Sequence, residues 1–454
     1  MPAELAKVFK AYDVRGVYPD EIDEDLARAV GRAFVAVTGA PAVAIGQDMR
    51  PSSTPMAAAL SEGATSQGAD VIQVGLCSTD MLYFVSGALG VAGVMLTASH
   101  NPARYNGFKL CRPGAVPVGQ ESGLAEIERM VAAGEPVSLA DRPGTVSQRD
   151  DLLRRYAEHV RGFVDRRALR PLKVVADAGN GMAGHVLPAV FEGLPFQLEP
   201  MYFELDGNFP NHPADPINPE NLADLRKQVV ASGADVGLAF DGDADRMFLV
   251  DEQGAVVPSS LVVALVAETM CEREPGSVVL YNLICSRVVP ETVRAAGGTP
   301  VRTRVGHSFI KQVMADTGAV FGGEHSGHYY FRDNYRADSG LIAALVVLDV
   351  LSRAARPLSE VLAPYRKYAA SGEINRRVDE PGAVVASLAD AGRWPAATST
   401  DRTDGLTVHG PTWWFNLRPS NTEPLLRLNV EAATEEEMAR VRDEVLEAVG
   451  GEPA

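Results

Sequence analysis

The sequence predicts an α/β protein made of three related α/β domains with mixed, mostly parallel sheets, followed by a smaller C-terminal α+β domain. Short apolar runs alternate with amphipathic stretches as far as about residue 368, which is typical of parallel α/β units. A Gly-Ala pair, an apolar run and a polar loop recur near residues 87, 233 and 318. Beyond residue 368 the strand-like runs have hairpin spacing. We therefore place the domains at 1–145, 146–255, 256–368 and 369–454.

The composition limits the possible partners and surroundings. In 454 residues, 59 acidic and 42 basic side chains give a net charge of −17, which disfavours nucleic acid and an anionic membrane as partners. The four cysteines have no paired spacing, which argues against a zinc site or a disulfide framework. The N-terminus has no apolar core of signal-peptide length, and the longest apolar run, near residues 341–351, is too short to span a bilayer and contains Asp349. We expect a cytoplasmic protein.

The first domain leads to the polar loop of residues 97–109. This loop follows the buried-looking strand 91–96 and carries the hydroxyl of Ser99, the imidazole of His100 and the amine of Lys109. Ligands bind at the carboxyl ends of strands in open α/β sheets, although the turn dipeptides here also suit an ordinary surface loop. Elsewhere in this domain we expect a strand-like piece at 9–16 and strands at 43–46 and 71–74. We also expect three helices: one with Leu26, Val30 and Phe34 on its apolar face, one that begins at Thr54, and one with Leu124, Ile127 and Val131 on its apolar face.

The second domain follows a predicted linker at 134–148. A helix at 152–163 and a strand at 172–177 precede a loop rich in Asn and Pro, residues 206–221. A helix and a strand ending at Phe240 then deliver the segment Asp241-Gly242-Asp243-Ala244-Asp245-Arg246.

Three aspartates spaced two apart indicate a cation site. Carboxylates converge only around strong positive charge, and a hard divalent ion such as Mg²⁺ prefers these ligands. An EF-hand is the main rival, because Asp241, Asp243, Asp245 and Glu252 occupy its first, third, fifth and twelfth places. Its sixth place requires Gly but here holds Arg246, and the flanks read as strands. A solvated acidic turn is the plainer alternative.

The third and fourth domains each contribute one further loop. In the third domain we expect an apolar helix from Pro258, a strand at 278–281 and the loop 323–328, whose carboxylate and hydroxyl suit sugar hydroxyls or a salt bridge. In the fourth domain we expect strands at 376–378, 406–408, 413–417 and 426–431, and a helix from the capping box at Thr434 to Gly450. The loop 418–424 carries hydroxyls, an amide and a guanidinium that suit a phosphate. A serine loop, a magnesium loop and a phosphate loop together indicate phosphoryl transfer.

These four motifs, in this order, resemble the α-D-phosphohexomutase family and most closely its phosphomannomutase/phosphoglucomutase branch. The motifs are Thr97–Pro102, Asp241–Arg246, Gly323–His328 and Arg418–Thr422. The resemblance implies four domains around a central cleft and the exchange of mannose or glucose 1-phosphate with the 6-phosphate. A phosphoserine and a hexose 1,6-bisphosphate would be the intermediates, with glucose 1,6-bisphosphate as activator. It also implies a cytoplasmic monomer or dimer.

The same resemblance implies roles for individual residues. Ser99 would carry the phosphoryl group and, with Asp241, Asp243 and Asp245, hold Mg²⁺. Glu324 and Ser326 would grip the sugar's 3- and 4-hydroxyls. The remaining residues fall into three sets: Lys109, His328, His100 and Arg246 assisting catalysis, the first two by proton transfer; Tyr12, Arg15 and His307 binding substrate; and Arg418, Ser420, Asn421 and Thr422 holding the phosphate that does not react.

One departure and several alternatives remain. Many relatives carry a lysine where this chain has Ile284, so either Arg287 or Arg302 takes over its phosphate contact or the contact is lost. Phosphoglucosamine mutase is the alternative within the family. From other classes, a metal-dependent sugar-phosphate phosphatase would share the aspartates, and a non-catalytic binding module would not need Ser99 phosphorylated. We also expect the last domain to close the cleft about a hinge at 365–372.

Overall fold

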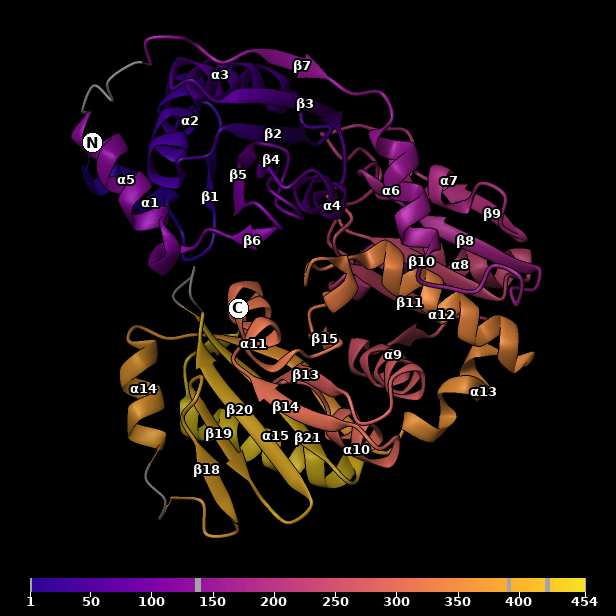
Figure 1. Ribbon diagram of the computed structural model, residues 1–454. Helices are drawn as coiled ribbons and strands as arrows, with labels where there is room; N and C mark the ends of the chain where they lie inside the picture. Colours follow the sequence, from indigo (N-terminus) through magenta and orange to yellow (C-terminus); the bar gives the residue numbers. More distant parts are fainter. Residues whose placement is uncertain (1, 135–139, 390–392, 421–424, 454) are drawn as a thin grey trace.

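The computed structural model describes residues 2–134, 140–389, 393–420 and 425–453. Its strands form four sheets, which follow one another along the chain (Figure 1). Three of the sheets mix parallel and antiparallel pairs, and the fourth is antiparallel. The predicted fold class is confirmed.

The first sheet has the order β1-β5-β4-β2-β3-β7, with β6 beside β5. Its β4-β2-β3-β7 half is parallel and its β1-β5-β4 half is antiparallel. Its elements are α1 (Pro2–Val8), β1 (Val14–Val17), α2 (Glu24–Thr38), β2 (Ala42–Gln47), α3 (Ser53–Ser66), β3 (Asp70–Leu76), α4 (Thr79–Leu89), β4 (Ala92–Leu96), β5 (Tyr105–Arg112), β6 (Val116–Pro117), α5 (Leu124–Ala133) and β7 (Val146–Gln148).

Helix α2 shows why the helical spacing of apolar residues predicted this element correctly. Leu26, Val30 and Phe34 are buried on one face, as predicted. The side chain of Asp23 accepts a hydrogen bond from the amide of Leu26 and caps the first turn, and Gly39 ends the helix in the left-handed conformation.

The predicted linker at 134–148 is wrong over its last three residues. Val146, Ser147 and Gln148 form β7, which pairs in parallel with β3 at the edge of the first sheet. Three residues are too few for a periodic signal, and all three are exposed. The first sheet therefore extends past the predicted boundary at residue 145.

The second sheet has the order β12-β11-β10-β8-β9, and the third has the order β14-β13-β15-β16. The second domain contains α6 (Leu152–Arg161), β8 (Leu172–Asp177), α7 (Ala183–Phe191), β9 (Phe196–Met201), α8 (Ala223–Ser232), β10 (Val236–Phe240), β11 (Met247–Asp251) and β12 (Val256–Val257). The third contains α9 (Ser259–Arg273), β13 (Val278–Asn282), α10 (Val288–Ala295), β14 (Thr299–Thr303), α11 (His307–Thr317), β15 (Phe321–Gly323), β16 (Tyr329–Phe331), α12 (Gly340–Ala354) and α13 (Leu358–Leu362).

Helices α9 and α12 join the second and third sheets. Both are apolar and buried along most of their length. Their side chains belong to one hydrophobic core that also includes residues of β8, β10, β15 and α4. Within the described residues, no helix has both the length and the apolarity needed to cross a membrane.

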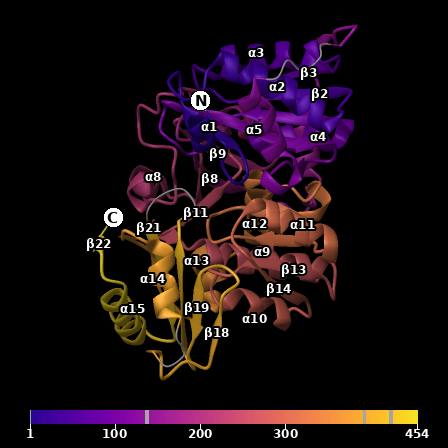
Figure 2. The same cartoon turned by 90° about the vertical axis from the view of Figure 1, so that its left-hand side faces the viewer.

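The fourth domain has its own core beside the third domain (Figures 1 and 2). The sheet order is β18-β19-β20-β21-β17-β22, with every pair antiparallel. Thr434 caps the last helix by accepting a hydrogen bond from the amide of Glu437, as the capping box predicted. The elements are β17 (Ala369–Arg377), α14 (Pro381–Leu388), β18 (Ser399–Asp401), β19 (Leu406–His409), β20 (Trp413–Pro419), β21 (Leu425–Ala432), α15 (Glu435–Val449) and β22 (Glu452–Pro453).

The four predicted loops share one structural setting. Each joins two strands that are antiparallel neighbours: β4 and β5, β10 and β11, β15 and β16, and β20 and β21. In the first three domains the repeat also places a left-handed glycine at the end of the preceding helix. That glycine is Gly90 in the first domain, because Gly87 lies within α4, whereas Gly233 and Gly318 are as predicted.

Candidate active site

Ser99 lies where the first and second domains meet. Its Oγ donates a hydrogen bond to Asp241 Oδ2 at 2.8 Å and is 3.3 Å from His100 Nδ1. The guanidinium of Arg246 reaches the same oxygen at 3.4 Å. The φ of Ser99 is +50°, a left-handed conformation that costs a non-glycine residue on the order of 1 kcal/mol. The predicted nucleophile is thus aimed at the predicted metal loop.

The three aspartates of the metal loop do converge. Carboxylate oxygens of Asp241, Asp243 and Asp245 lie within 4.8 Å of one another, and all three side chains are buried. Oδ1 of Asp243 and Oδ1 of Asp245 accept no hydrogen bond from any described residue. The flanking segments are β10 and β11, which rules out the helices of an EF-hand. Buried carboxylate oxygens that lack donors fit a hard cation such as Mg²⁺.

Two cations partly neutralise this loop. Lys109 Nζ donates to Asp243 Oδ2 at 2.7 Å and to Asp245 Oδ2 at 2.6 Å, and Arg246 Nε donates to Asp241 Oδ2 at 2.7 Å. Burial lowers the pKa of the Lys109 ammonium, but Asp243 and Asp245 outweigh burial and raise that pKa well above its usual value. Lys109 therefore stays protonated.

The aspartates themselves titrate differently. Burial raises the pKa of Asp241 to about 7, although Arg246 opposes it. Burial acts in the same sense on Asp243, but the ammonium of Lys109 and a hydrogen bond from Thr79 hold the pKa of that carboxyl below its usual value. Burial and the nearby charge of Arg246 hold the pKa of His100 well below its ordinary value.

The third loop meets the second through its backbone. Arg246 and His328 form an isolated antiparallel bridge, which places His328 Nε2 3.8 Å from Asp245 Oδ1. Ser326 Oγ lies 2.8 Å from His328 Nδ1. Four of the predicted site residues, Asp245, Arg246, Ser326 and His328, are therefore joined across two domains.

Glu324 is held by its own domain. One oxygen of its buried carboxylate accepts hydrogen bonds from Asn282 Nδ2 and the amide of Gly306, both at 3.2 Å, and the other accepts one from Tyr330 OH at 2.7 Å. His328 Nδ1 is 3.7 Å from the second oxygen. These donors fix the direction of the carboxylate.

In the fourth loop the structure describes residues 418–420, and Arg418 and Ser420 have hydrogen-bond partners in their own domain. Arg418 Nη2 donates to Glu373 Oε2 at 3.3 Å, and Arg427 donates to Ser420 Oγ at 3.4 Å. Arg418 and Arg427 are cross-strand partners, so two guanidinium groups flank the loop. His325 of the third domain feels the charge of both Glu373 and Arg418. The predicted residues Asn421 and Thr422 lie outside the described residues.

The first domain also reaches the third. The ring of Tyr12 packs edge-on against Phe309, with 6.0 Å between ring centroids. Arg15 Nη1 donates to Asn101 Oδ1 at 2.6 Å, so it lies on the Ser99 loop. His307 is the first residue of α11.

The residues proposed to replace the lysine at Ile284 are both engaged elsewhere. Ile284 is buried against Trp414 of the fourth domain. Arg287 donates to the carbonyl of Trp413, and Arg302 forms an ion pair with Asp401. Both arginines join the third domain to the fourth.

Sequence reasoning missed several residues that organise the site. Arg50 is buried beneath the Ser99 loop, Thr79 donates to Asp243, and Arg427 flanks the phosphate loop. Asp48 and Arg50 follow the end of β2, the parallel neighbour of β4. A charged pair at that strand end was the available signal for Arg50.

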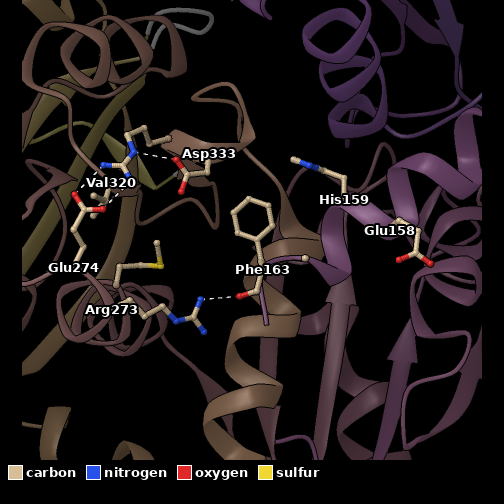
Figure 3. A pocket seen from close by; sticks show the side chains of 10 residues that line it. Glu158, His159, Phe163, Arg273, Glu274, Val320 and Asp333 are labelled. Atoms are coloured by element: carbon tan, nitrogen blue, oxygen red, sulfur yellow. Dashed lines mark hydrogen bonds and ion pairs between the residues drawn. The ribbon is translucent and has the colours of Figure 1, made fainter. Parts of the chain in front are cut away.

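A pocket of about 460 Å³ lies elsewhere, between α6 and the third domain (Figure 3). His159, Phe163 and Arg273 line it, and its charged groups include the ion pair of Arg332 with Glu274. Of the predicted site residues that the structure describes, none lines this pocket.

Comparison with known families matches four domain models along the chain. These are described as phosphoglucomutase/phosphomannomutase α/β/α domain I over residues 6–137, domain II over 154–254, domain III over 258–368, and the C-terminal domain over 373–448. Their order follows the four sheets.

Whole-length relatives agree. The chain is 40% identical over 452 residues to a phosphomannomutase of Salmonella typhimurium, covering 97% of this chain and 98% of that protein. It is 38% identical over 448 residues to a phosphomannomutase/phosphoglucomutase of Pseudomonas aeruginosa, covering 97% and 95%. A solved structure of a phosphoglucomutase/phosphomannomutase family protein from Burkholderia thailandensis superposes with a TM-score of 0.89 at 34% identity, covering 98% and 99% of the two chains. The chain belongs to the phosphoglucomutase/phosphomannomutase family.

Proposed function

We propose that this protein is a phosphohexomutase that interconverts hexose 1-phosphates and hexose 6-phosphates, with Ser99 as the phosphoryl carrier. The observation that carries the proposal is the contact of Ser99 Oγ with Asp241, beside two further aspartates and the cations Lys109 and Arg246. Phosphoryl transfer depends on positioning and on neutralising charge, and this arrangement supplies both. Relatives that cover nearly the whole chain are named phosphomannomutase and phosphomannomutase/phosphoglucomutase.

The reaction consists of two related transfers. First the bond between Ser99 Oγ and phosphorus breaks and phosphorus bonds to a free hydroxyl oxygen of the sugar phosphate. The hydroxyl proton leaves to a base, and Ser99 Oγ takes up a proton to become a free hydroxyl. The bisphosphate then turns over in the site. In the second transfer Ser99 Oγ gives up its proton to a base and attacks the other phosphoryl group, whose bond to the sugar oxygen breaks. The released sugar oxygen takes up a proton.

The site supplies candidates for both proton movements. Lys109 is the candidate proton donor, but two carboxylates raise the pKa of its ammonium and make it a weak acid, so its first role is as a neutralising charge. His328 is half-buried beside Asp245 and serves as the acceptor. Arg246 and His100 lie beside the serine oxygen and assist the transfer.

The residues fit a resident Mg²⁺. Asp241, Asp243 and Asp245 would hold it together with the phosphoryl group on Ser99, and the ion would neutralise the charge that develops during transfer. We predict that EDTA abolishes turnover and that added Mg²⁺ restores it. Activity that persists in excess EDTA would contradict the assignment.

The other loops bind the substrate. Glu324 and Ser326 receive the sugar hydroxyls, and Arg418 with Ser420 holds the phosphate that does not react; Asn421 and Thr422 complete that loop in the proposal. The cross-strand guanidinium pair of Arg418 and Arg427 supports this role, because two phosphates require cations at both ends of the site. A phosphatase has no need of this second anion site. Tyr12 and Arg15 border the sugar between these ends, a role that the family resemblance also implies for His307.

A coupled assay tests the proposal. Mannose 1-phosphate, glucose 1-phosphate and glucosamine 1-phosphate are compared with Mg²⁺ and a trace of glucose 1,6-bisphosphate. We expect comparable kcat/KM for the first two, and mass spectrometry of the enzyme treated with glucose 1,6-bisphosphate should find phosphate on Ser99. A preference for the third sugar would reassign the protein to phosphoglucosamine mutase. Absence of both turnover and Ser99 phosphorylation would overturn the proposal.

A further inference from the structure

We propose that Arg50 is a positioning residue that holds Ser99 in the conformation needed for phosphoryl transfer. The inference rests on the proposed function and adds a residue to it. Arg50 lies three residues past the last residue of β2, and only 1% of it is exposed. Because it is buried beneath the Ser99 loop, its role is exerted through the loop that it supports.

The guanidinium of Arg50 donates to backbone carbonyls of the Ser99 loop. Nη2 donates to the carbonyls of Ser99 at 3.0 Å and Asn101 at 2.6 Å. Nη1 donates to the carbonyls of Pro102 at 2.8 Å and Tyr105 at 2.9 Å. One side chain thus satisfies four carbonyls of a single loop.

The conformation of Ser99 requires such an anchor. Its backbone lies in the left-handed region, which a serine leaves readily unless its surroundings hold it there. On the other side, the Ser99 carbonyl lies against Gly242, where an added Cβ would come within 2.4 Å of that oxygen. Arg50 and Gly242 therefore clamp the same peptide group, and the clamp directs Oγ at Asp241.

The second domain holds Arg50 in turn. The guanidinium lies over the ring of Phe209, 5.1 Å from its centroid. A Cβ on Gly207 would lie 2.6 Å from Arg50 Cα, so the backbones of these two segments touch. Both residues belong to the Asn- and Pro-rich loop 206–221, for which the sequence predicted no role. The loop thereby fixes the serine loop of one domain relative to the metal loop of the other.

Only arginine can make this set of contacts. Asp48 Oδ2 balances the charge by accepting from Arg50 Nε at 3.1 Å, and Asp48 Oδ1 accepts from the amide of Arg50 and from Ser53. Five N–H groups in a planar fork can serve a carboxylate and four carbonyls together. A lysine keeps the charge but has three donors on one atom, so it would release at least part of the loop.

The test compares Arg50→Lys with Arg161→Lys. Arg161 is a matched control, since it is also buried and donates to backbone carbonyls, those of Ala189 and Glu192, outside the Ser99 loop. For both variants we measure kcat, KM, Tm, and the fraction of Ser99 phosphorylated by glucose 1,6-bisphosphate.

We expect Arg50→Lys to lower kcat about 100-fold and slow Ser99 phosphorylation equally, because small misplacement of a reacting group has effects of this size. KM should change little, and Arg161→Lys should lower Tm without this loss of kcat. Equal losses of kcat in the two variants, or an unchanged kcat in Arg50→Lys, would overturn the inference. The proposed function would still stand in either case, provided that the wild-type enzyme is active.

If Arg50→Lys does not fold, Phe209→Leu decides. It retains Arg50 but removes the aromatic face beneath the guanidinium. We expect kcat to fall several-fold with KM unchanged, and an unchanged kcat in the folded variant would refute the role of this clamp.

Discussion

The proposed site has two halves that are built differently. Around Ser99, loops of the first and second domains bond directly to each other, through Ser99 to Asp241 and Lys109 to Asp243. Arg418, in the part of its loop that the structure describes, donates a hydrogen bond to Glu373 of the same domain. The fourth domain is tied to the third by other residues, among them Arg302, which pairs with Asp401, and Arg287, which donates to the carbonyl of Trp413.

This difference suggests that one half serves catalysis and the other serves substrate binding. In the half proposed to react, side chains of two domains already contact one another, so this half would lower the barrier without reorganisation. In the half proposed to hold the second phosphate, Arg418 and Arg427 are in place, and the described hydrogen bond of Arg418 lies within its own domain, so bound substrate would link the two halves. We therefore expect changes around Ser99 to reduce kcat and changes around Arg418 to raise KM.

The largest effect should come from Ser99→Ala. Without Oγ no phosphoenzyme forms, so kcat should fall at least about 1,000-fold. The proposed binding contacts remain, so the variant should still bind glucose 1-phosphate in calorimetry with similar affinity. Turnover within about tenfold of wild type would show that the two halves do not divide the work in this way.

Arg418→Ala tests the other half. An arginine bond to a phosphate is worth about 1.5–3 kcal/mol, so KM should rise roughly tenfold to 100-fold with a smaller change in kcat. The variant should also release more free hexose bisphosphate, which is measured by mass spectrometry of the reaction mixture. Arg440→Ala, on the outer helix α15, is the control. A normal KM in Arg418→Ala, together with no additional release of bisphosphate, would contradict the phosphate-binding role proposed for this loop.

The comparison also explains what the sequence could predict. The Ser99 and Asp241 loops follow strongly apolar strands and concentrate reactive groups within a few residues, so local patterns identified both. Left-handed glycines, apolar periodicity and the capping residues Asp23 and Thr434 determined the neighbouring elements in the same way. It was less evident from the sequence that each of the four loops joins two neighbouring antiparallel strands, because this depends on the order of the strands in the sheet.

The residues that were missed act over long separations. Arg50 meets its carbonyl acceptors about fifty positions away, and Thr79 reaches Asp243 across two domains. Strand β7 is recognisable only from its pairing with β3. Such contacts depend on tertiary packing, which no local pattern encodes. The engagement of Arg287 and Arg302 by the fourth domain was hidden for the same reason.

Asp80 offers the smallest and sharpest test of the preassembled half. Its buried carboxylate joins three domains, since it accepts hydrogen bonds from Tyr156 OH at 2.6 Å and from Ser339 Oγ at 2.5 Å. It follows Thr79, which holds Asp243, so it anchors the start of α4 beside the metal loop. Burial raises the pKa of this carboxyl from 3.8 to about 6, although these hydrogen bonds oppose the shift.

Because the pKa of Asp80 is higher in the folded than in the unfolded state, the folded state binds this proton more tightly. The resulting stability is complete below about pH 4 and is lost as the pH rises through 6, amounting to about 3 kcal/mol at 1.36 kcal/mol per pKa unit. Asp80→Asn removes this titration, so the Tm of wild type should fall relative to that of the variant between about pH 4 and 7. Asp20→Asn, at an exposed turn, should follow wild type throughout. Parallel curves of Tm against pH for wild type and Asp80→Asn would contradict this prediction. They would mean that the folded protein stabilises the charged and the neutral forms of Asp80 equally, so burying the charged carboxylate at this junction costs no stability.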